Sequence, residues 1–367
     1  MRRILIVCTT DSMIWNFLVP HIKEMEKNGY YVECASSITG DFFYNLKSKY
    51  GIKMNEIPFD RSPYDLKNVK AYKLLCDLIK VKKFDTIFCH EPVGGAMGRI
   101  AGHKCNCKVI YMAHGFHFFK GAPKSRVIYY WVEKLLSYYT DILITINQED
   151  YNAALKFKEK KCYKINGIGV DTSKFCKDDS FRDYLNNEFD LAGDAVKLLS
   201  VGELIPRKNH EVVIRALAKL KESKIYYFIA GDGEIKTELD KLVKTLKLEK
   251  NVFLLGYRTD IRQLCNSSDI FVMPSVHEGL SVALMEAMGC GKPIVCSNIR
   301  GNVDLIDDQK GGFLCKTNDE NEYCTSILKL VESPELREKF GEYNSEKVYS
   351  FDVNNIVKDV LSIISEG

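Results

Sequence analysis

The sequence predicts an α/β protein with two doubly wound parallel sheets, one in each half of the chain. Apolar runs of strand length alternate with helix-like stretches, and this alternation occurs in two successive sets. The runs are continuous rather than interrupted by polar residues, as expected for parallel strands that are buried on both faces. With 367 residues the chain is long enough for two domains of ordinary size. We therefore expect two such domains facing each other across a cleft at the carboxyl ends of their strands.

The first set of elements lies in residues 1–170, the predicted N-terminal domain. Strands are expected at residues 3–8, 31–36, 86–89, 108–115 and 141–147, with helical stretches near 13–28 and 68–80. The chain then becomes polar over residues 177–190, which we interpret as a linker region.

The second set lies in residues 171–349, the predicted C-terminal domain. Strands are expected at residues 196–202, 225–231, 251–256, 269–274, 293–297 and 312–315, with helical stretches between them. A last helix-like segment, Val353 to Ser365, lies within residues 350–367. This segment is a candidate to pack back on the first domain.

The composition is that of a soluble globular protein, with 46% hydrophobic and 28% charged residues. The apolar runs are too short to span a membrane, and the basic start is not followed by a signal-peptide core, so we expect a cytosolic protein. Thirteen cysteines are scattered, mostly inside apolar runs, and form no Cys-x-x-Cys pair. This pattern favours free thiols in a reducing compartment over disulfides or a metal site.

The charge is divided unequally between the two halves. Residues 1–170 hold 26 Lys and Arg against 16 Asp and Glu, a net charge of +10, whereas residues 171–367 hold 26 against 33, a net charge of −7. A basic half suggests an anionic partner. On charge alone, nucleic acid and an anionic membrane leaflet both remain open.

The most informative segment runs from Pro274 to Ser297, because it holds two carboxylates at a predicted strand–turn–helix junction. Glu278 lies in a glycine-containing loop, and Glu286 lies about two turns into a helix expected at Leu280–Met288. A helix N-terminus after a strand binds anions through free backbone N–H groups and the helix dipole. A carboxylate beyond that anion site suits a sugar or ribose hydroxyl, so the segment predicts a pocket for a sugar linked to a nucleoside diphosphate.

Two further features of the second half have a functional and a structural interpretation. Arg207 and Lys208 stand at a helix start, where a cation is unfavourable unless a bound anion such as diphosphate is present; otherwise they are solvated charges. Gly231-Asp232-Gly233 is either a structural turn or a contact to the base or ribose.

In the first half, several residues fall at the predicted carboxyl ends of strands. His114 follows an apolar strand and is either a structural histidine or a sugar contact, with His117 as a weaker neighbour. Gly94 and Gly95 allow close approach of a ligand or tight packing of the backbone.

The stretch from Phe116 to Tyr139 combines many aromatic residues with the cations Lys120, Lys124 and Arg126. This combination suits a membrane interface, and the alternative is that the aromatic residues belong to the core.

The chain resembles the retaining nucleotide-sugar glycosyltransferases of family 4, which have the GT-B fold of two Rossmann-like domains. In the second half the matching segments are VGELIPRKNH (201–210), IAGDGE (229–234), VFLLGYR (252–258) and HEGLSVALMEAMGCGKPIV (277–295). The first half is similar to a subgroup that builds capsular, exopolysaccharide or other lipid-linked bacterial glycans, through RSPYDLKN (61–68), HEPVGG (90–95), YMAHGFHFFKGAP (111–123) and LITINQED (143–150).

The resemblance implies a metal-independent transferase without a cofactor. It implies a UDP-sugar as donor, a polyprenyl-diphosphate-linked saccharide as acceptor, and a protein held peripherally on the inner face of the cell membrane. Glu278 is then placed near the transferring sugar and Glu286 on the ribose hydroxyls. The expected roles are catalysis for Glu278, His114, Lys208 and Arg207, donor binding for Glu286, Gly279, Leu280, Ser281, Gly231 and Gly233, acceptor binding for Gly94, Gly95 and His117, and membrane contact for Lys120, Lys124 and Arg126.

Two positions depart from the family pattern. Glu203 stands where the family usually has Arg, so Arg207 and Lys208 are the expected substitutes at the diphosphate. Residues Thr9 to Ser12 occupy the first strand–helix loop, where two glycines are common.

Three alternative functions are weighed. An NAD-linked oxidoreductase requires Gly-x-Gly-x-x-Gly after a strand, and neither residues 8–16 nor residues 201–209 supply it. A nucleotide-sugar epimerase of the same two-domain architecture is disfavoured by the match in the first half. A non-catalytic subunit of a transferase complex remains open because of Glu203. No Asp-x-Asp motif for a divalent ion occurs in the chain.

Overall fold

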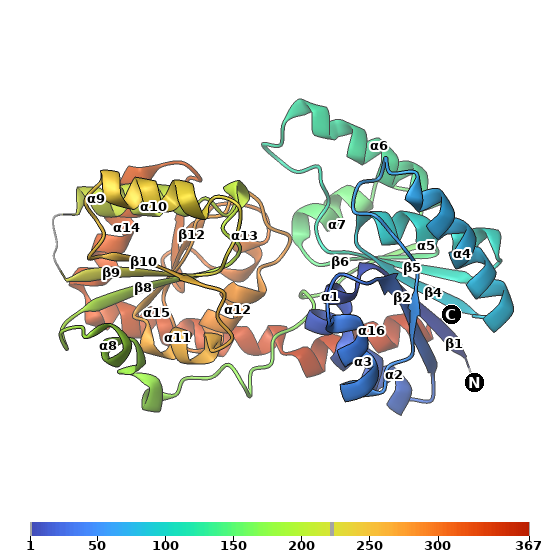
Figure 1. The fold of residues 1–367 in the computed structure, drawn as a ribbon, viewed down its shortest axis with the longest axis horizontal. Helices are drawn as coiled ribbons and strands as arrows, with labels where there is room; N and C mark the ends of the chain where they lie inside the picture. Colours follow the sequence, from blue (N-terminus) through green and yellow to red (C-terminus); the bar gives the residue numbers. More distant parts are fainter. Residues whose placement is uncertain (1, 221–223, 367) are drawn as a thin grey trace. The chain divides into compact units, whose positions relative to one another are not determined.

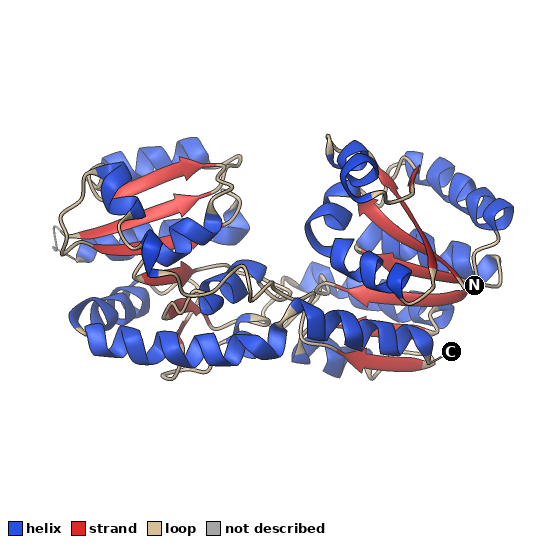
Figure 2. Ribbon diagram, turned by 90° about the horizontal axis from the view of Figure 1, so that it is seen from below, coloured by secondary structure: helices blue, strands red, loops and turns tan. Residues whose placement is uncertain are grey.

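A computed structural model describes residues 2–220 and 224–366 and divides the chain into two compact units. Unit 1 comprises Met1–Gly169 and Val353–Gly367, and unit 2 comprises Val170–Asp352. Each unit is built on one parallel sheet with helices on both faces (Figures 1 and 2). The predicted α/β class with two doubly wound sheets is confirmed.

The sheet of unit 1 has seven strands in the order β3-β2-β1-β4-β5-β6-β7. The order reverses beside β1, which pairs with β2 on one side and β4 on the other. Residues such as Ile6 and Phe88, paired across β1 and β4, are fully buried because helices cover both faces. The strands are β1 (Arg3–Thr10), β2 (Tyr31–Ser37), β3 (Met54–Glu56), β4 (Thr86–His90), β5 (Lys108–Ala113), β6 (Ile142–Thr145) and β7 (Lys161–Lys164).

Helices α4 and α5 lie on one face of this sheet, and α2 and α16 lie side by side on the other (Figure 1). The amphipathic helix α16 packs on unit 1, and the Lys108 ammonium donates to the Ile364 carbonyl at 3.0 Å. The helices of this unit are α1 (Asp11–Met13), the π-helical turn η1 (Ile14–Leu18), α2 (Val19–Lys27), α3 (Phe42–Tyr50), α4 (Lys67–Lys82), α5 (Pro92–Lys104), α6 (Val127–Leu136), α7 (Gln148–Ala154) and α16 (Val353–Ser365), with short 3-10 turns at Lys124–Arg126 and Ser137–Tyr139.

The sheet of unit 2 has six parallel strands in the order β10-β9-β8-β11-β12-β13. They are β8 (Val196–Val201), β9 (Ile225–Ala230), β10 (Val252–Gly256), β11 (Ile270–Met273), β12 (Ile294–Ser297) and β13 (Gly312–Cys315). The chain order again reverses beside the first strand, since β8 pairs with β9 and with β11. The loops after β8 and β11 therefore emerge next to each other at the carboxyl edge of the sheet.

Helices cover both faces of this sheet, with α9, α10 and α14 on one side and α8, α11, α12 and α15 on the other (Figure 1). Their bounds are α8 (Tyr184–Phe189), α9 (His210–Lys219), α10 (Lys236–Thr245), α11 (Ile261–Ser267), α12 (Val282–Gly289), α13 (Asn302–Leu305), α14 (Glu320–Glu332) and α15 (Pro334–Lys347), with 3-10 turns at Asp179–Phe181, Pro206–Lys208 and Val348–Phe351.

The predicted linker at residues 177–190 is wrong, because this segment is part of unit 2. It forms a 3-10 turn and helix α8, whose Leu185 is fully buried and donates its N–H to the Ser267 hydroxyl at 2.9 Å. Polar contacts with α11 add to this attachment, since the Asp178 carboxylate lies 2.8 Å from the Arg262 guanidinium of that helix.

The first strand–helix junction also differs from the expected loop. Strand β1 continues to Thr10 and helix α1 begins at Asp11, so no loop separates them. The Asp11 carboxylate is buried and accepts the N–H groups of Thr39 at 3.2 Å and Phe43 at 3.0 Å. This carboxylate thus attaches the start of α3 to the end of β1. Among the described helices, none is both long and apolar enough to cross a membrane.

Candidate active site

The carboxyl edge of the unit 2 sheet gathers a cluster of charged side chains around Glu278. Its carboxylate is 2.7 Å from the Lys208 ammonium and 3.1 Å from the Arg207 guanidinium. Lys208 and Arg207 end the turn after β8, whereas Glu278 lies in the loop after β11, so the pairing follows from the adjacency of these two strands. Three residues selected from the sequence are therefore in direct contact.

The environment of Glu278 keeps it ionised. The residue is 8% exposed, and burial alone would raise the pKa of its carboxyl group. The cations of Lys208 and Arg207 outweigh that effect, and the net pKa is lowered. Glu278 therefore stays anionic at neutral pH and holds both cations at the edge of the sheet.

Two residues that were not selected from the sequence complete this cluster. Arg300, after β12, donates through Nε to the Glu278 carbonyl at 3.2 Å, and its Nη2 lies 2.5 Å from Nε2 of His277. Arg300 is buried and fixes the loop through these two contacts. In the sequence, the feature that could have pointed to Arg300 is an Arg-Gly pair that follows a predicted strand. With Arg207, Lys208 and Arg300 against Glu278, the cluster carries a net charge of +2, which suits a diphosphate.

Hydrogen bonds to backbone carbonyl groups hold the two loops together. The Val276 N–H donates to the Arg207 carbonyl at 2.8 Å, and the Arg207 guanidinium donates to the His277 carbonyl at 2.9 Å. The Asn209 amide donates to the Pro274 carbonyl at 3.2 Å, and Asn209 adopts the left-handed conformation with φ of 53° at the start of α9. The cations are therefore fixed by their backbone as well as by Glu278.

Helix α12 begins two residues later than expected, at Val282, with Ser281 as its N-cap. The Ser281 hydroxyl accepts the Leu284 N–H at 3.3 Å, so this hydroxyl satisfies one N–H of the first turn. Gly279 and Leu280 precede the cap in the loop after β11. Because the helix is shorter, Glu286 lies a little over one turn into it, rather than two.

Glu286 has a different electrostatic environment from Glu278. Burial raises the pKa of its carboxyl group to about 7, and the Lys174 cation opposes that rise only in part. Glu286 therefore titrates near neutral pH, where Glu278 is fully ionised. This raised pKa distinguishes Glu286 from a surface helix carboxylate.

Gly231 and Gly233 lie where two loops cross at van der Waals distance. A Cβ on Gly231 would stand 1.8 Å from the Gly202 carbonyl oxygen, and one on Gly233 would stand 2.4 Å from the Leu204 carbonyl oxygen. Backbone packing therefore requires glycine at both positions. The predicted donor contact from this turn stays a prediction beside that structural role.

Gly301 supports the Glu278 loop by close approach, which gives a testable prediction. A Cβ on Gly301 would stand 2.3 Å from the Gly279 carbonyl oxygen, and Gly301 has φ of +82°. We expect Gly301→Ala to displace the Gly279–Leu280 backbone, to cost about 2–3 kcal/mol of folding free energy, and to weaken nucleotide binding.

The matched control for this prediction is Gly29→Ala. Gly29 has the same φ of +82°, but a Cβ added there would meet nothing within 4 Å, so its substitution reports the conformational strain alone. Thermal unfolding and calorimetric titration with UDP measure the two effects. Equal losses of stability in both variants and unchanged UDP affinity in Gly301→Ala would show that Gly301 does not support the loop.

In unit 1, the predicted sugar contact His114 forms a pair with His90, which sequence reasoning did not select. Nε2 of His114 lies 3.0 Å from Nδ1 of His90 at the carboxyl ends of β5 and β4. Burial lowers the pKa of His114 to about 3 and holds the pKa of His90 well below its usual value. Both rings are thus neutral at pH 7, and a single proton lies between them.

Gly94 and Gly95 have a clear packing role at the start of helix α5. A Cβ on Gly94 would stand 2.7 Å from the Thr9 backbone nitrogen, and one on Gly95 would stand 2.5 Å from the Tyr111 ring. The Gly94 N–H donates to the Thr9 hydroxyl at 2.9 Å. His117 is exposed, with its ring 5.2 Å from the Tyr129 ring. The acceptor roles of these residues stay predictions.

Lys120, Lys124 and Arg126 line one cavity of about 610 Å³ beside the start of α6. Phe118, Phe119 and Tyr130 contribute aromatic surface to the same cavity. The basic and aromatic residues of the predicted membrane-facing stretch are therefore neighbours in space.

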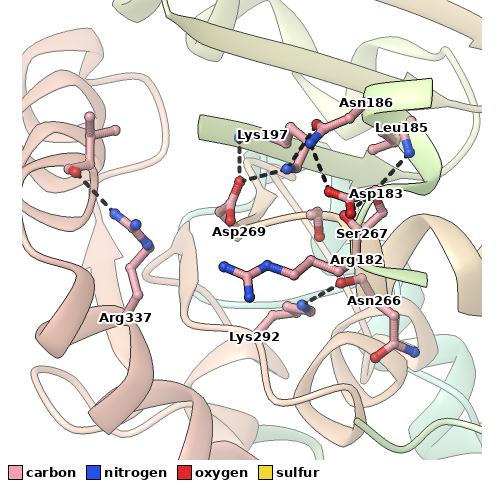
Figure 3. A network of polar contacts seen from close by, with 12 residues as sticks. Arg182, Asp183, Leu185, Asn186, Lys197, Asn266, Ser267, Asp269, Lys292 and Arg337 are labelled. Atoms are coloured by element: carbon pink, nitrogen blue, oxygen red, sulfur yellow. Dashed lines mark hydrogen bonds and ion pairs between the residues drawn. The ribbon is translucent and has the colours of Figure 1, made fainter. Parts of the chain in front are cut away.

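A polar pocket of unit 2 lies at the opposite, amino-terminal edge of its sheet (Figure 3). The buried Lys197 ammonium donates to the Asn186 side chain at 3.1 Å and lies 3.6 Å from the Asp269 carboxylate. Lys292 donates to the Asn266 carbonyl at 2.9 Å. This network attaches α8 and α11 to the sheet, away from the carboxyl-edge loops that carry the predicted donor site.

Comparison with known proteins identifies the class of enzyme to which these units belong. Residues 182–347 match the family model "Glycosyl transferases group 1", and residues 3–147 match "Glycosyl transferase 4-like". The chain belongs to the GT-B glycosyltransferases that these two models describe. The oxidoreductase alternative is therefore wrong, and the predicted membership of the GT-B glycosyltransferases is confirmed.

The chain is similar over most of its length to individual members of the class. It is 34% identical to "Putative glycosyltransferase EpsD" of Bacillus subtilis (strain 168), over 99% of this chain and 96% of the relative. It is 31% identical to the "UDP-Gal:alpha-D-GlcNAc-diphosphoundecaprenol alpha-1,3-galactosyltransferase" of Escherichia coli, over 81% and 79% of the two chains. The crystal structure of HepE from Anabaena in complex with UDP superimposes with a TM-score of 0.85 over the whole of both chains at 19% identity, which supports the fold.

Proposed function

We propose that the protein transfers a sugar from a UDP-sugar to a polyprenyl-diphosphate-linked saccharide during assembly of a bacterial surface glycan. The observation that carries this proposal is the cluster of Arg207, Lys208 and Arg300 around Glu278 at the carboxyl edge of the unit 2 sheet. The name of the Escherichia coli relative, which specifies UDP-galactose and a diphosphoundecaprenol acceptor, supports the substrate classes. The UDP bound to HepE supports the nucleotide.

The proposed chemistry retains the anomeric configuration and needs no metal. The bond between the anomeric carbon and the diphosphate oxygen breaks, and a bond from the acceptor hydroxyl oxygen to that carbon forms on the same face. Lys208 and Arg207 stabilise the negative charge that develops on the departing diphosphate. The departing phosphate oxygen takes the proton of the acceptor hydroxyl. Transfer that is unchanged in the presence of EDTA, with the donor configuration preserved in the product, is the expected behaviour.

A panel of nucleotide sugars tests the proposal. A bound donor stabilises the folded state by mass action, so at least one UDP-sugar should raise the melting temperature of the purified protein. The same UDP-sugar should be turned over, with release of UDP and without a second protein. Stabilisation by a donor without any turnover would favour the non-catalytic subunit, and interconversion of epimers without UDP release would favour the epimerase. Absence of stabilisation by any nucleotide sugar would contradict the proposal.

Peripheral membrane attachment through the cations around the 610 Å³ cavity is part of the proposal. We expect simultaneous substitution of Lys120, Lys124 and Arg126 by Ala to reduce binding to anionic vesicles by about 100-fold, since each cation near such a surface contributes about 1 kcal/mol. Sedimentation with phosphatidylglycerol vesicles at low salt measures this effect, because charge attraction is strongest there. Vesicle binding equal to that of the unsubstituted protein would rule out this surface.

A further inference from the structure

Helix α6 presents apolar side chains that the other elements of unit 1 leave uncovered. Val127, Ile128, Trp131, Val132 and Leu135 are each at least 44% exposed on a helix of ten residues. Scattered apolar residues are normal on a protein surface, but a continuous stripe of this kind indicates a binding surface.

Part of this stripe closes a cavity of about 530 Å³, within the size range of small-molecule sites. Ile128, Val132 and Leu136 line it from α6, and Met97 lines it from α5. Trp131 and Leu135 lie on the same helix and are outside the lining. The exposed face of α6 therefore divides into a part that belongs to the cavity and a part that does not.

The cavity has a polar end and an apolar end. Thr9, Glu91 and His117 line it at the carboxyl edge of the sheet, where β1, β4 and β5 end. Met97 follows Glu91 by more than one turn of α5, so the apolar lining extends along the helices, away from that edge. An occupant with a polar head and an apolar tail matches this division of the lining.

The lining carries one cation, Arg61, and two carboxylates, Glu91 and Glu133, so an anionic head fits only beside Arg61. Arg61 contributes a cation from the loop that precedes α4. The carboxylate of Glu133 is neutralised by the buried Arg99 guanidinium at 2.7 Å. The carboxylate of Glu91 accepts the N–H of Thr10 at 3.1 Å, and Glu91 is held at φ of 60°, a strained conformation for a residue with a side chain. Such strain is concentrated at functional positions.

We propose that this cavity binds the first isoprene units of the acceptor lipid, with Arg61 at the diphosphate and Glu91 toward the saccharide. The inference rests on the proposed function, because it assigns a place in unit 1 to the acceptor of that reaction. It separates two roles on one helix: Ile128, Val132 and Leu136 contact the prenyl chain, whereas Trp131 and Leu135 face outward.

A chain-length series tests this assignment without any catalytic step. Dimethylallyl, geranyl and farnesyl diphosphate are titrated calorimetrically below their micelle-forming concentrations, with saturating UDP present to compete for any diphosphate site in unit 2. We expect affinity to rise by about tenfold or more from the shortest to the longest chain, because each added unit removes apolar surface from water. Inorganic diphosphate should bind no better than the shortest chain. Equal affinity for all three prenyl diphosphates would overturn the proposal.

Two substitutions on the same helix distinguish the cavity from the outer face. Val132→Glu places a charge in the lining and Leu135→Glu places one outside it, at side chains that are 44% and 61% exposed. We expect Val132→Glu to weaken farnesyl diphosphate binding about tenfold or more and Leu135→Glu to change it by less than about twofold. Equal effects of the two substitutions would contradict the assignment. So would conversion of a dimer to a monomer by Val132→Glu in sedimentation, which would identify the face as a self-contact.

Arg61→Ala completes the test. It should weaken binding of all three prenyl diphosphates by a similar factor, since Arg61 is assigned to the head and not to the chain. Lys70→Ala, at an exposed position on the neighbouring helix α4, is the matched control. Loss of chain-length dependence in Arg61→Ala would contradict this division of roles. Failure of the nucleotide-sugar panel would overturn the proposed function alone, because prenyl diphosphate binding is measured independently of it.

Discussion

Lys208→Ala should reduce the rate of sugar transfer by about 100-fold to 1,000-fold, the range observed when one group that stabilises developing negative charge is removed. Lys208 is 2.7 Å from the Glu278 carboxylate, in the cluster that faces the proposed diphosphate site. The substitution should also cost about 1–3 kcal/mol of folding free energy, because Glu278 is buried and loses one of its two cations. Steady-state kinetics and thermal unfolding measure the two effects.

The double variant Lys208→Ala/Glu278→Gln separates stability from catalysis. The neutral amide no longer needs a cation, so the double variant should recover most of the lost stability while remaining inactive. Lys224→Ala, which removes an exposed ion pair with Asp194 elsewhere in unit 2, is the control and should leave transfer unchanged. Recovery of activity together with stability in the double variant would show that Lys208 has only a structural role.

Glu286→Gln should remove a pH dependence of donor binding. The carboxyl pKa of about 7 means that Glu286 is partly protonated at neutral pH, whereas an ionised carboxylate is the better acceptor for the two ribose hydroxyls. Affinity for a UDP-sugar should therefore rise on the order of tenfold between pH 6 and pH 8, because at most one proton is released. UDP-sugars have no phosphate group that titrates in this window, so the effect reports the protein.

The same substitution has an opposite effect on stability. A folded pKa raised above the ordinary value of 4.5 means that ionisation of Glu286 destabilises the donor-free protein as pH rises toward and through 7. Glu286→Gln should thus stabilise the protein at pH 8, by on the order of 3 kcal/mol at most, and change little below pH 4.5. It should also weaken UDP-sugar binding about tenfold at pH 8. A wild-type pH profile in the variant would show that Glu286 does not contact the ribose.

Most central strands could be predicted because they are continuous apolar runs. Strand β11, Ile270–Met273, is fully buried, and its sequence Ile-Phe-Val-Met is apolar throughout. The two edge strands of the unit 1 sheet, β3 and β7, were missed for a physical reason, since an edge strand is partly exposed and needs no apolar run. Strand β7, for example, has the sequence Lys-Cys-Tyr-Lys over Lys161–Lys164, and both lysines are exposed. The helix start at Val282 was misplaced because an N-cap at Ser281 is decided by local hydrogen bonds.

The candidate site was predictable as a set of residue types and not as a set of contacts. Lys208 and Glu278 are 70 residues apart, so only the adjacency of β8 and β11 brings them within 2.7 Å. Arg300 was missed because its role depends on a hydrogen bond to the Glu278 carbonyl, 22 residues away, which no local spacing encodes. The cavity beside α6 could not be predicted from the sequence either, since its lining comes from α5, α6 and the loop at Arg61.

Transfer to a lipid-linked acceptor by the purified protein tests the central claim most directly. The protein is incubated with the UDP-sugar selected by the panel and a synthetic saccharide linked to a short polyprenyl diphosphate, and the products are analysed by mass spectrometry. We expect the acceptor mass to increase by one sugar residue, with stoichiometric release of UDP and no product with Lys208→Ala in the same reaction time. Release of UDP with free sugar as the sole product, for every polyprenyl-diphosphate acceptor supplied, would contradict the account.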